Sequence, residues 1–406
     1  MTHARLVGLI LVVQAAPVGA VTPVARLVKD LDPGSEPFHL FVSRPTMAGG
    51  KAFFTANSQE HGAELWVSSG AASGTGKIAD ILPGFRTSSP EQMMAMDGNM
   101  FFSADDGIHG RELWVSDGTT AGTIMVADVF PGSESSTPVP LAAASGKLWF
   151  TAFTAQGPGL WCTDGTAANT VKLNPTPPSG PAPALLRPSH FSVLDGSFIF
   201  ASDNWIWKSD GTSEGTEVIE EIPEYGDFVQ VYEMALIGDS VYYIVSSDFR
   251  EWLWRTDGQA GGAVMIPKEP GLESWQVLRG LLPVGGKVSF FAESELGDPL
   301  EWYCGDGTLD GSVRFDNQTF KRFNDESCVV GDIVYFGIEN TARGGELYRS
   351  DGTLKGTYLE PVPNPADSAE RVGWFSSGPA IPSLGSRHRR ISPRFTPSLR
   401  VCGGFS

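Results

Sequence analysis

The sequence has little cysteine. Its 406 residues contain four Cys, at positions 162, 304, 328 and 402. Their spacing matches no zinc pattern, and four Cys in so long a chain do not make a disulfide framework. Cys162 and Cys304 follow equivalent aromatic residues in a repeated motif, so we expect both on strands. Cys304 and Cys328 are the only pair close enough in sequence to suggest a bond, and whether they pair stays open.

Residue patterns that carry well-known chemistry are also scarce. The six His lie in no H-E-x-x-H pattern, and no G-x-S-x-G elbow and no D-x-D-x-D-G calcium loop is present. His61 and His109 occupy matching positions, in "EHGAELW" and "IHGRELW", and are interpreted as a loop feature. The acidic pairs Asp105-Asp106 and Glu220-Glu221 are interpreted as solvated loops. We therefore expect no catalytic residues and no cofactor, with Ca²⁺ as the one cation left open.

Long apolar runs are absent except at the start. Residues 1–20 combine Arg5, an apolar run from Leu6 to Val13 and small residues around Ala20, the layout of a cleavable signal peptide. The run is too short to span a bilayer, and no other stretch is a transmembrane candidate. This predicts a protein that is secreted or held at the cell surface, periplasmic or extracellular.

Basic residues are few between the two ends of the chain. Residues 21–375 hold 23 Lys and Arg against 47 Asp and Glu, a balance that repels nucleic acid and anionic membranes. Residues 376–406 differ: they hold five Arg and no acid and are rich in Pro and Ser. We expect this basic tail to be disordered.

One motif recurs seven times at steps of 45 to 49 residues. The copies are "ELWVSSGAASGT" (64–75), "ELWVSDGTTAGT" (112–123), "GLWCTDGTAANT" (159–170), "WIWKSDGTSEGT" (205–216), "WLWRTDGQAGGA" (252–263), "EWYCGDGTLDGS" (301–312) and "ELYRSDGTLKGT" (346–357). A G-x-Φ-x-F strand precedes each copy, and a V-x-D-Φ-x-P-G segment accompanies the first ones. No sustained helical period is present. The pattern of each unit therefore predicts four short antiparallel strands joined by turns that contain Gly, Pro and Asp.

The repeat predicts an all-β fold, a seven-bladed β-propeller built from four-stranded repeats of about 47 residues, over residues 21–375. Each strand that carries the motif needs both faces covered, which the two neighbouring blades would do. The turn Asp should accept a local backbone hydrogen bond. The structural repeat positions are Trp66, Trp114, Trp161, Trp207, Trp254, Tyr303, Tyr348, Asp117, Asp164, Asp210, Asp257, Asp306 and Asp351.

The chain resembles the bacterial ELWxxDGT repeat proteins over roughly residues 25–365. "ELWVSDGT" at 112–119 fits the motif fully, whereas Ser69, Gln259, Tyr303 and Tyr348 depart from it. The resemblance implies secretion and a propeller-like fold, and it implies no known reaction. We predict that residues 24–32 and 346–362 share one blade, in which 24–32 pairs with the last hairpin and closes a ring of seven. The rival arrangement is that 358–365 begins a truncated eighth blade.

Two functions fit these observations. The first is a monomeric, secreted or cell-surface propeller that binds an unknown protein or glycan partner, as an adhesion or interaction scaffold without catalytic residues. The alternative is a hydrolase or lyase with its active site in the central channel of the propeller. A channel enzyme needs polar residues that break the repeat at specific places, and no such set is evident from the sequence. The sequence therefore favours the binding scaffold.

Export makes a direct prediction about the mature protein. If residues 1–20 are a signal peptide, the mature chain begins near Val21. Amino-terminal sequencing of exported, folded protein measures this. An intact Met1 on such material would contradict the predicted signal peptide.

Overall fold

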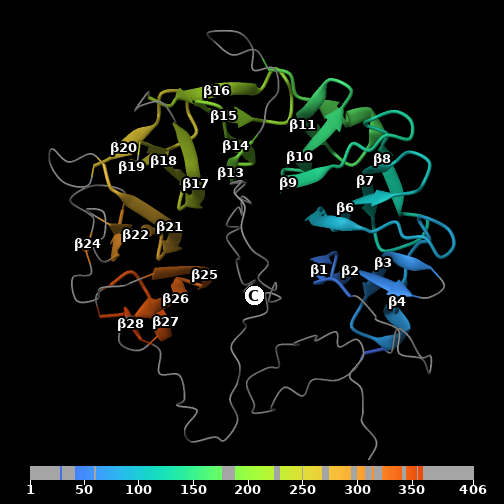
Figure 1. The fold of residues 1–406 in the computed structure, drawn as a ribbon, viewed down its shortest axis with the longest axis horizontal. Coiled ribbons are helices and arrows are strands. Elements are labelled where there is room, and N and C mark those ends of the chain that lie inside the picture. Colours follow the sequence, from blue (N-terminus) through green and yellow to red (C-terminus); the bar gives the residue numbers. More distant parts are fainter. Residues whose placement is uncertain are drawn as a thin grey trace, which may run out of the picture. The chain divides into compact units, whose positions relative to one another are not determined.

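The computed structural model shows an all-β chain. It describes residues 28–29, 42–58, 61–175, 188–223, 229–248, 250–267, 274–293, 300–306, 313–314, 322–340, 344–353 and 355–359. The predicted signal peptide and basic tail lie outside these residues. The described strands form seven antiparallel four-stranded sheets, each in simple chain order (Figure 1). This confirms the predicted all-β class and the four-stranded unit.

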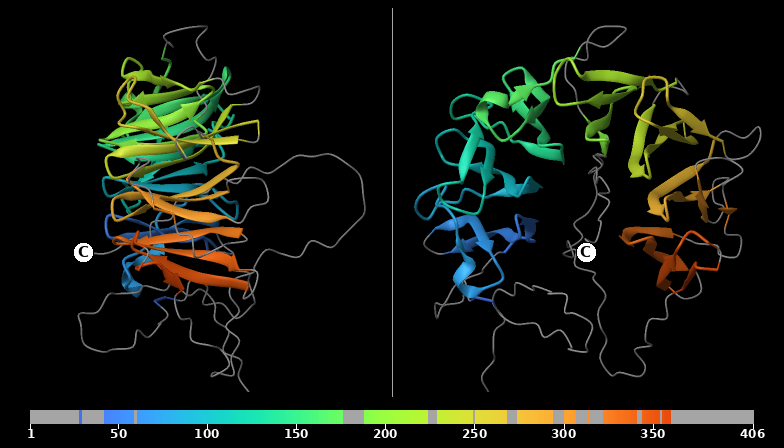
Figure 2. Two further views of the ribbon diagram at one scale, coloured as in Figure 1. Left: turned by 90° about the vertical axis from the view of Figure 1, so that its left-hand side faces the viewer. Right: turned by 180° about the vertical axis from the view of Figure 1, so that it is seen from behind.

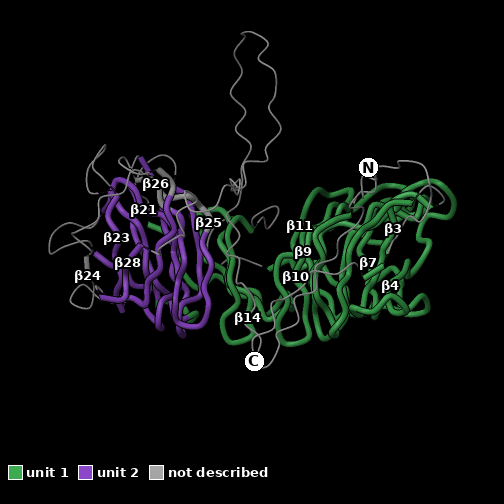
Figure 3. Tube along the Cα trace, turned by 90° about the horizontal axis from the view of Figure 1, so that it is seen from below, with its two compact units in different colours: residues 1–223, 258–262 green, residues 224–257, 263–406 purple. Residues whose placement is uncertain are grey.

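Two compact units divide the chain (Figure 3). One comprises residues 1–223 with 258–262, and the other residues 224–257 with 263–406. In the first unit, sheet 1 contains β1 (Thr46–Ala48), β2 (Lys51–Ser58), β3 (Gly62–Ser68) and β4 (Thr75–Lys77), and sheet 2 contains β5 (Glu91–Met96), β6 (Asn99–Asp105), β7 (Arg111–Ser116) and β8 (Ile124–Ala127). Sheet 3 contains β9 (Val139–Ala144), β10 (Lys147–Thr154), β11 (Gly157–Thr163) and β12 (Val171–Lys172), and sheet 4 contains β13 (His190–Leu194), β14 (Ser197–Ser202), β15 (Trp205–Ser209) and β16 (Thr216–Glu221).

The second unit holds the remaining three sheets. Sheet 5 contains β17 (Gln230–Ile237), β18 (Ser240–Ser247), β19 (Arg250–Thr256) and β20 (Val264–Ile266). Sheet 6 contains β21 (Val277–Val284), β22 (Lys287–Glu293), β23 (Glu301–Gly305) and β24 (Val313–Arg314), and sheet 7 contains β25 (Arg322–Val330), β26 (Ile333–Asn340), β27 (Gly344–Ser350) and β28 (Tyr358–Leu359). Two short 3-10 helices, η1 (Ala72–Gly74) and η2 (Ala167–Asn169), lie in hairpin loops.

Successive sheets within a unit pack face to face. The first strands β1, β5, β9 and β13 of the first unit follow one another side by side, as do β17, β21 and β25 of the second (Figure 2). The apolar core lies in the seams between sheets. Leu113 of β7 packs in the seam with sheet 3, whereas the adjacent Trp114 packs in the seam with sheet 1. Alternate side chains of one strand thus serve two seams, because they point to opposite faces of the sheet.

The motif aromatics also pair with an aromatic on the second strand of their own sheet. Phe150 faces Trp161 with ring centroids 6.2 Å apart, and Tyr243 stacks on Trp254 at 6.3 Å. Cross-strand aromatic pairs of this kind stabilise a sheet beyond the area that they bury. Trp207, Tyr303 and Tyr348 are buried, whereas Trp66, Trp114, Trp161 and Trp254 are half-buried. The seams therefore cover the seven motif aromatics to different degrees.

Sheet 7 obtains its fourth strand from its own end of the chain. Tyr358 and Leu359, the described residues of the 358–365 segment, form β28 and pair with Arg349 and Tyr348. Of residues 24–32, only Val28 and Lys29 are described, and neither lies in a strand. The Lys29 ammonium donates to the Thr75 carbonyl at 2.6 Å, beside sheet 1. The expected pairing of 24–32 with the last hairpin is therefore not among the described strand pairs.

The Asp-Gly turn is a contact between sheets as well as a turn. Gly211 has a φ of +89°, and a Cβ added there would lie 2.7 Å from the Cys162 sulfur of the preceding sheet. Glycine is thus required twice, by the left-handed backbone and by the close approach. Thr120 of the same loop in sheet 2 donates to the Ile78 carbonyl of sheet 1 at 2.5 Å.

This double requirement predicts that Gly211→Ala destabilises the protein more than Gly132→Ala does. Gly132 has a φ of +105° with no atom near its missing Cβ, so alanine there costs only backbone strain, about 1–2 kcal/mol. Gly211→Ala adds overpacking against Cys162, about 1–3 kcal/mol more. Urea unfolding of the two variants measures the difference. Equal losses would show that the turn does not brace the preceding sheet.

Candidate functional site

The repeated Asp-Gly-Thr loops are closed by local hydrogen bonds. In sheet 2, Asp117 Oδ1 accepts from the Thr119 backbone N–H and hydroxyl, both at 2.7 Å, and Thr119 Oγ1 accepts from the Gly122 N–H at 3.0 Å. The same Asp–Thr bonds occur at Asp164, Asp210 and Asp351. These bonds hold the pKa of each of these Asp side chains below its usual range. Because Oδ1 accepts both bonds inside the turn, these Asp side chains are turn-forming groups.

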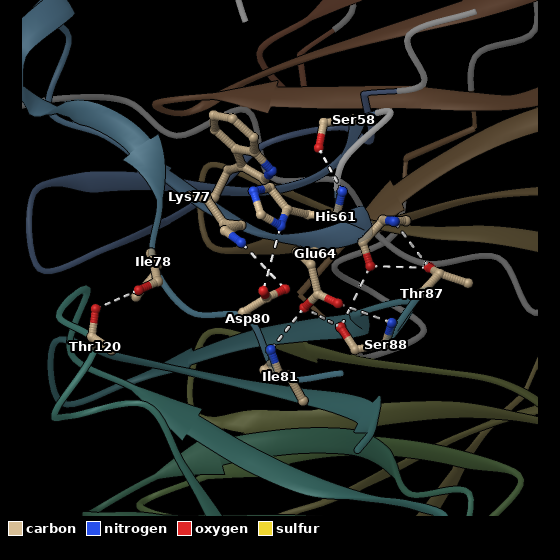
Figure 4. A network of polar contacts seen from close by, with 12 residues as sticks. Ser58, His61, Glu64, Lys77, Ile78, Asp80, Ile81, Thr87, Ser88 and Thr120 are labelled. Carbon is tan, nitrogen blue, oxygen red and sulfur yellow. Dashed lines mark hydrogen bonds and ion pairs between the residues drawn. The ribbon is translucent and has the colours of Figure 1, made fainter. Parts of the chain in front are cut away.

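The motif Glu has a role that the sequence analysis missed. Glu64 and Glu112 are fully buried, and their carboxylates accept from the segment that leads to the next sheet. Glu112 accepts from the N–H groups of Val129 and Ser136, both at 3.1 Å, and from the Ser136 hydroxyl at 2.6 Å. Glu64 is bonded in the same way to Ile81 and Ser88 (Figure 4). A Glu in the first position of the motif, followed 24 residues later by Ser, was the available signal.

Burial is the dominant influence on these carboxyl groups. It raises the pKa of Glu64 and Glu112 above their usual value, against the opposing effect of the hydrogen bonds. Such groups have no access to a substrate. Their role is to fix the connecting segments 78–90 and 126–138, which lie beside the two His loops.

The two matching His residues have different partners. His61 Nδ1 lies 3.4 Å from Asp80 Oδ2, and Lys77 Nζ lies 3.2 Å from the other oxygen of the same carboxylate (Figure 4). In the next sheet, His109 Nδ1 lies 2.7 Å from Asp106, three residues earlier in the same loop. Asp106 also accepts from the backbone N–H groups of Ile108 and His109, both at 2.8 Å. The Asp80 carboxylate therefore contacts both His61 and Lys77, whereas the Asp106 side chain contacts the His109 ring.

The pairing sets the chemistry of His109. The hydrogen bond to Asp106 is the main cause that raises the pKa of His109 above its usual value. Because Nδ1 faces the carboxylate, a neutral His109 carries its lone pair on Nε2. The side chain is 37% exposed, against 14% for Asp106. A solvent-accessible imidazole held by a half-buried carboxylate is a competent general base.

Ser58 completes a superficial likeness to a hydrolytic triad beside His61. Its hydroxyl accepts from the His61 backbone N–H at 3.2 Å (Figure 4). A nucleophilic serine must instead give its proton to the imidazole ring. Ser58 therefore serves as an acceptor for the His61 backbone.

The other sequence-level candidates are placed as follows. Glu220 and Glu221 lie at the end of β16, so their interpretation as loop residues was wrong, and burial raises the pKa of Glu220. The described cysteines are not bonded to one another. Cys162 and Cys304 are buried free thiols and Cys328 forms no disulfide either, so the Cys304–Cys328 bond is not formed. Burial raises the pKa of both thiols to about 11. Within the described ranges, no group of three His, Cys, Asp or Glu could hold a metal ion, and no helix is long and apolar enough to cross a membrane.

Comparisons with known proteins give structures but no family. No protein-family model matches the chain, and no curated protein matches it. Similar solved structures include a puromycin hydrolase, with 13% identity, a TM-score of 0.42 and coverage of 79% of this chain and 54% of that one. An oligogalacturonate lyase in complex with manganese has 12% identity, a TM-score of 0.39 and coverage of 77% and 87%. Oligopeptidase B from Leishmania major has 9% identity, a TM-score of 0.41 and coverage of 74% and 46%.

These comparisons correct the function favoured by the sequence. The chain was expected to be a non-catalytic binding or adhesion scaffold, whereas the similar structures named above are two hydrolytic enzymes and a lyase. The chain spans about half the length of the puromycin hydrolase. Likeness at this level assigns no activity, and any assignment must come from the residues of this chain.

The buried Glu112 predicts a specific dependence of stability on pH. As pH rises from the usual Glu value, near 4.5, towards the raised pKa, the unfolded chain loses this proton before the folded chain does. The contribution of Glu112 to the free energy of unfolding therefore falls over this window. Glu112→Gln removes this dependence and also leaves a backbone N–H without an acceptor, which costs about 1–3 kcal/mol.

Urea unfolding between pH 4 and 7 tests this expectation. The advantage of the wild-type protein over Glu112→Gln should be largest at the acid end and should shrink towards neutral pH. Glu134→Gln, an exposed position of the same connecting segment, is the control and should leave the pH profile unchanged. A constant penalty for Glu112→Gln at every pH would refute the expectation.

Proposed function

We propose that this chain is an enzyme of the hydrolase or lyase type in which His109 transfers the proton. The observation that carries the proposal is the 2.7 Å contact between His109 Nδ1 and Asp106 Oδ2, which leaves Nε2 as the proton acceptor. In hydrolysis, Nε2 takes a proton from the attacking water, and in a lyase reaction it takes one from carbon. Asp106 holds the ring and stabilises the imidazolium that forms.

The position of this pair in the repeat supports the proposal. A site that serves a reaction is expected to break the repeat, whereas architecture recurs in it. A His occupies this loop position only in the first two units of the sequence. His109 is paired with Asp106 of its own loop, whereas His61 lies in an ion pair with Asp80 of the following connection. The neighbouring connection is held rigid by Glu112, which suits a base that must keep its orientation.

The proposal includes the larger architecture that the sequence predicts. We place the seven sheets as blades of one closed β-propeller in an exported member of the ELWxxDGT repeat class. Seven four-stranded sheets, and first strands that follow one another within each unit, support this arrangement. Secretion or display at the cell surface and a monomeric state remain predictions of the sequence alone.

His109→Gln should lower kcat by about 100-fold or more, because general-base catalysis contributes 10²–10⁴-fold. The assay is a panel of chromogenic esters and anilides, together with uronate polysaccharides followed by formation of a conjugated double bond. His61→Gln is the matched control, since it occupies the same repeat position while its Asp80 partner is shared with Lys77. This control should keep wild-type activity.

The pH profile separates a catalytic role of His109 from a structural one. A base must be neutral, so activity should rise with pH through the raised pKa of His109. Asp106→Asn removes the main cause of that raised pKa and should move the acid limb of the profile to lower pH. Wild-type protein that turns over none of the panel, or a fully active His109→Gln, would overturn the proposal.

A further inference from the structure

Two of the large apolar side chains that the structure describes as exposed lie on the segments around the proposed base. Phe85 is 82% exposed and Ile108 is 68% exposed. Ile108 directly precedes His109, and its backbone N–H donates to Asp106. Phe85 belongs to the connection between sheets 1 and 2. Single exposed apolar residues are common, so what matters here is their position relative to His109.

Close approaches at two glycines show how these segments lie. A Cβ on Gly107, in the His109 loop, would lie 2.7 Å from Leu82 Cδ1, three residues before Phe85. At the other end of this stretch, the missing Cβ of Gly62, beside His61, faces the carbonyls of Phe85 and Arg86. Residues 82–86 thus pass between the two His loops, and the loop at 105–110 borders them.

The repeat supplies an internal comparison for both side chains. In the next connection, "PGSES" replaces "PGFRT", so Ser133 stands where Phe85 stands in the first. In the first unit, "EHG" replaces "IHG", so Glu60 stands where Ile108 stands in the second. The fold therefore accepts a polar residue at each position. Neither apolar side chain is required by the architecture. Ile108 lies in the loop of the His109–Asp106 pair, and Phe85 lies in the connection whose Leu82 borders that loop.

We propose that Phe85 and Ile108 form a subsite for an apolar side chain, aromatic or branched aliphatic, of the substrate. This inference rests on the proposed function, because it places the substrate's reacting bond beside His109. An apolar neighbour favours esters or amides with an apolar substituent over a polyhydroxylated or charged chain, whose desolvation the subsite would not repay. The reaction it selects is therefore hydrolysis.

The first test compares substrate preference between variants. Phe85→Ser and Ile108→Glu each introduce the residue that the neighbouring repeat carries, so we expect both proteins to fold. With nitrophenyl esters of N-acetyl-phenylalanine, N-acetyl-leucine and N-acetyl-glycine, each variant should reduce the preference for Phe and Leu over Gly in kcat/KM by about tenfold. The change should lie mainly in KM. Phe153→Ser, at an exposed aromatic of sheet 3, is the control and should keep the wild-type preference.

A binding measurement keeps this inference separable from the proposed function. Ligand-observed NMR with N-acetyl-phenylalanine amide should show contact to the phenyl ring in His109→Gln, and this contact should be lost in the double variant His109→Gln, Phe85→Ser. If His109→Gln is inactive but Phe85→Ser keeps both the preference and the ring contact, the base stands and the subsite is refuted. If the ring contact depends on Phe85 while His109→Gln stays active, the subsite stands and the base is refuted.

Phe85 and Ile108 could instead contact a membrane or a second copy of the chain, and the tests distinguish these partners from a substrate. Binding of wild-type protein to neutral phosphatidylcholine vesicles that is lost in Phe85→Ser, with unchanged substrate preference, would identify a membrane contact and overturn the proposal. Unchanged preference, no ring contact and a Phe85-dependent self-association in analytical ultracentrifugation would identify a contact between copies of the chain, with the same consequence.

Discussion

The structure depends on packing one sheet against the next within each unit. A four-stranded sheet with 21 to 26 residues in its strands cannot bury two apolar faces by itself. Each sheet therefore relies on the sheet or sheets next to it in its unit. Leu113 and Trp114 show the division within one strand, one side chain in each seam. The Asp-Gly turn adds a backbone contact to the same seam, because Gly211 lies against Cys162 of the preceding sheet. Stability is therefore shared between neighbours, as in other repeat architectures.

The segments that connect one sheet to the next need hydrogen-bond partners for their backbone. A segment that crosses from one sheet to the next has backbone N–H groups with no strand to pair with. Glu64 and Glu112 satisfy these groups from inside the seam, at the expense of burying a carboxyl group whose pKa is raised. The result is a fixed connection, and fixed connections allow the neighbouring loop at residues 105–110 to hold a His–Asp pair in one geometry.

The parts of the fold that follow from local chemistry could be predicted from the sequence. Alternating apolar residues, Gly turns and the recurring motif indicate four short strands in each of seven units, and those sheets are present. Long-range relationships could not be predicted in the same way. Glu112 reaches its donors 17 and 24 residues later, and Tyr358 pairs with Arg349 where two pairings were open from the sequence. The degree of burial of each indole ring could not be predicted either, because it depends on the whole neighbouring sheet.

The candidate site shows why a matching sequence position does not ensure a matching role. His61 and His109 occupy the same place in their repeats, yet Asp80 is shared with Lys77 whereas Asp106 lies in the same loop as its His. The presence of Asp106 three residues before His109 was visible in the sequence. Its meaning was not, because an acidic pair in a loop is usually solvated. In a repeat protein, each unit can be compared with the others. Residues that recur in every unit maintain the seams between sheets, and a loop residue that differs from its counterparts indicates a functional position.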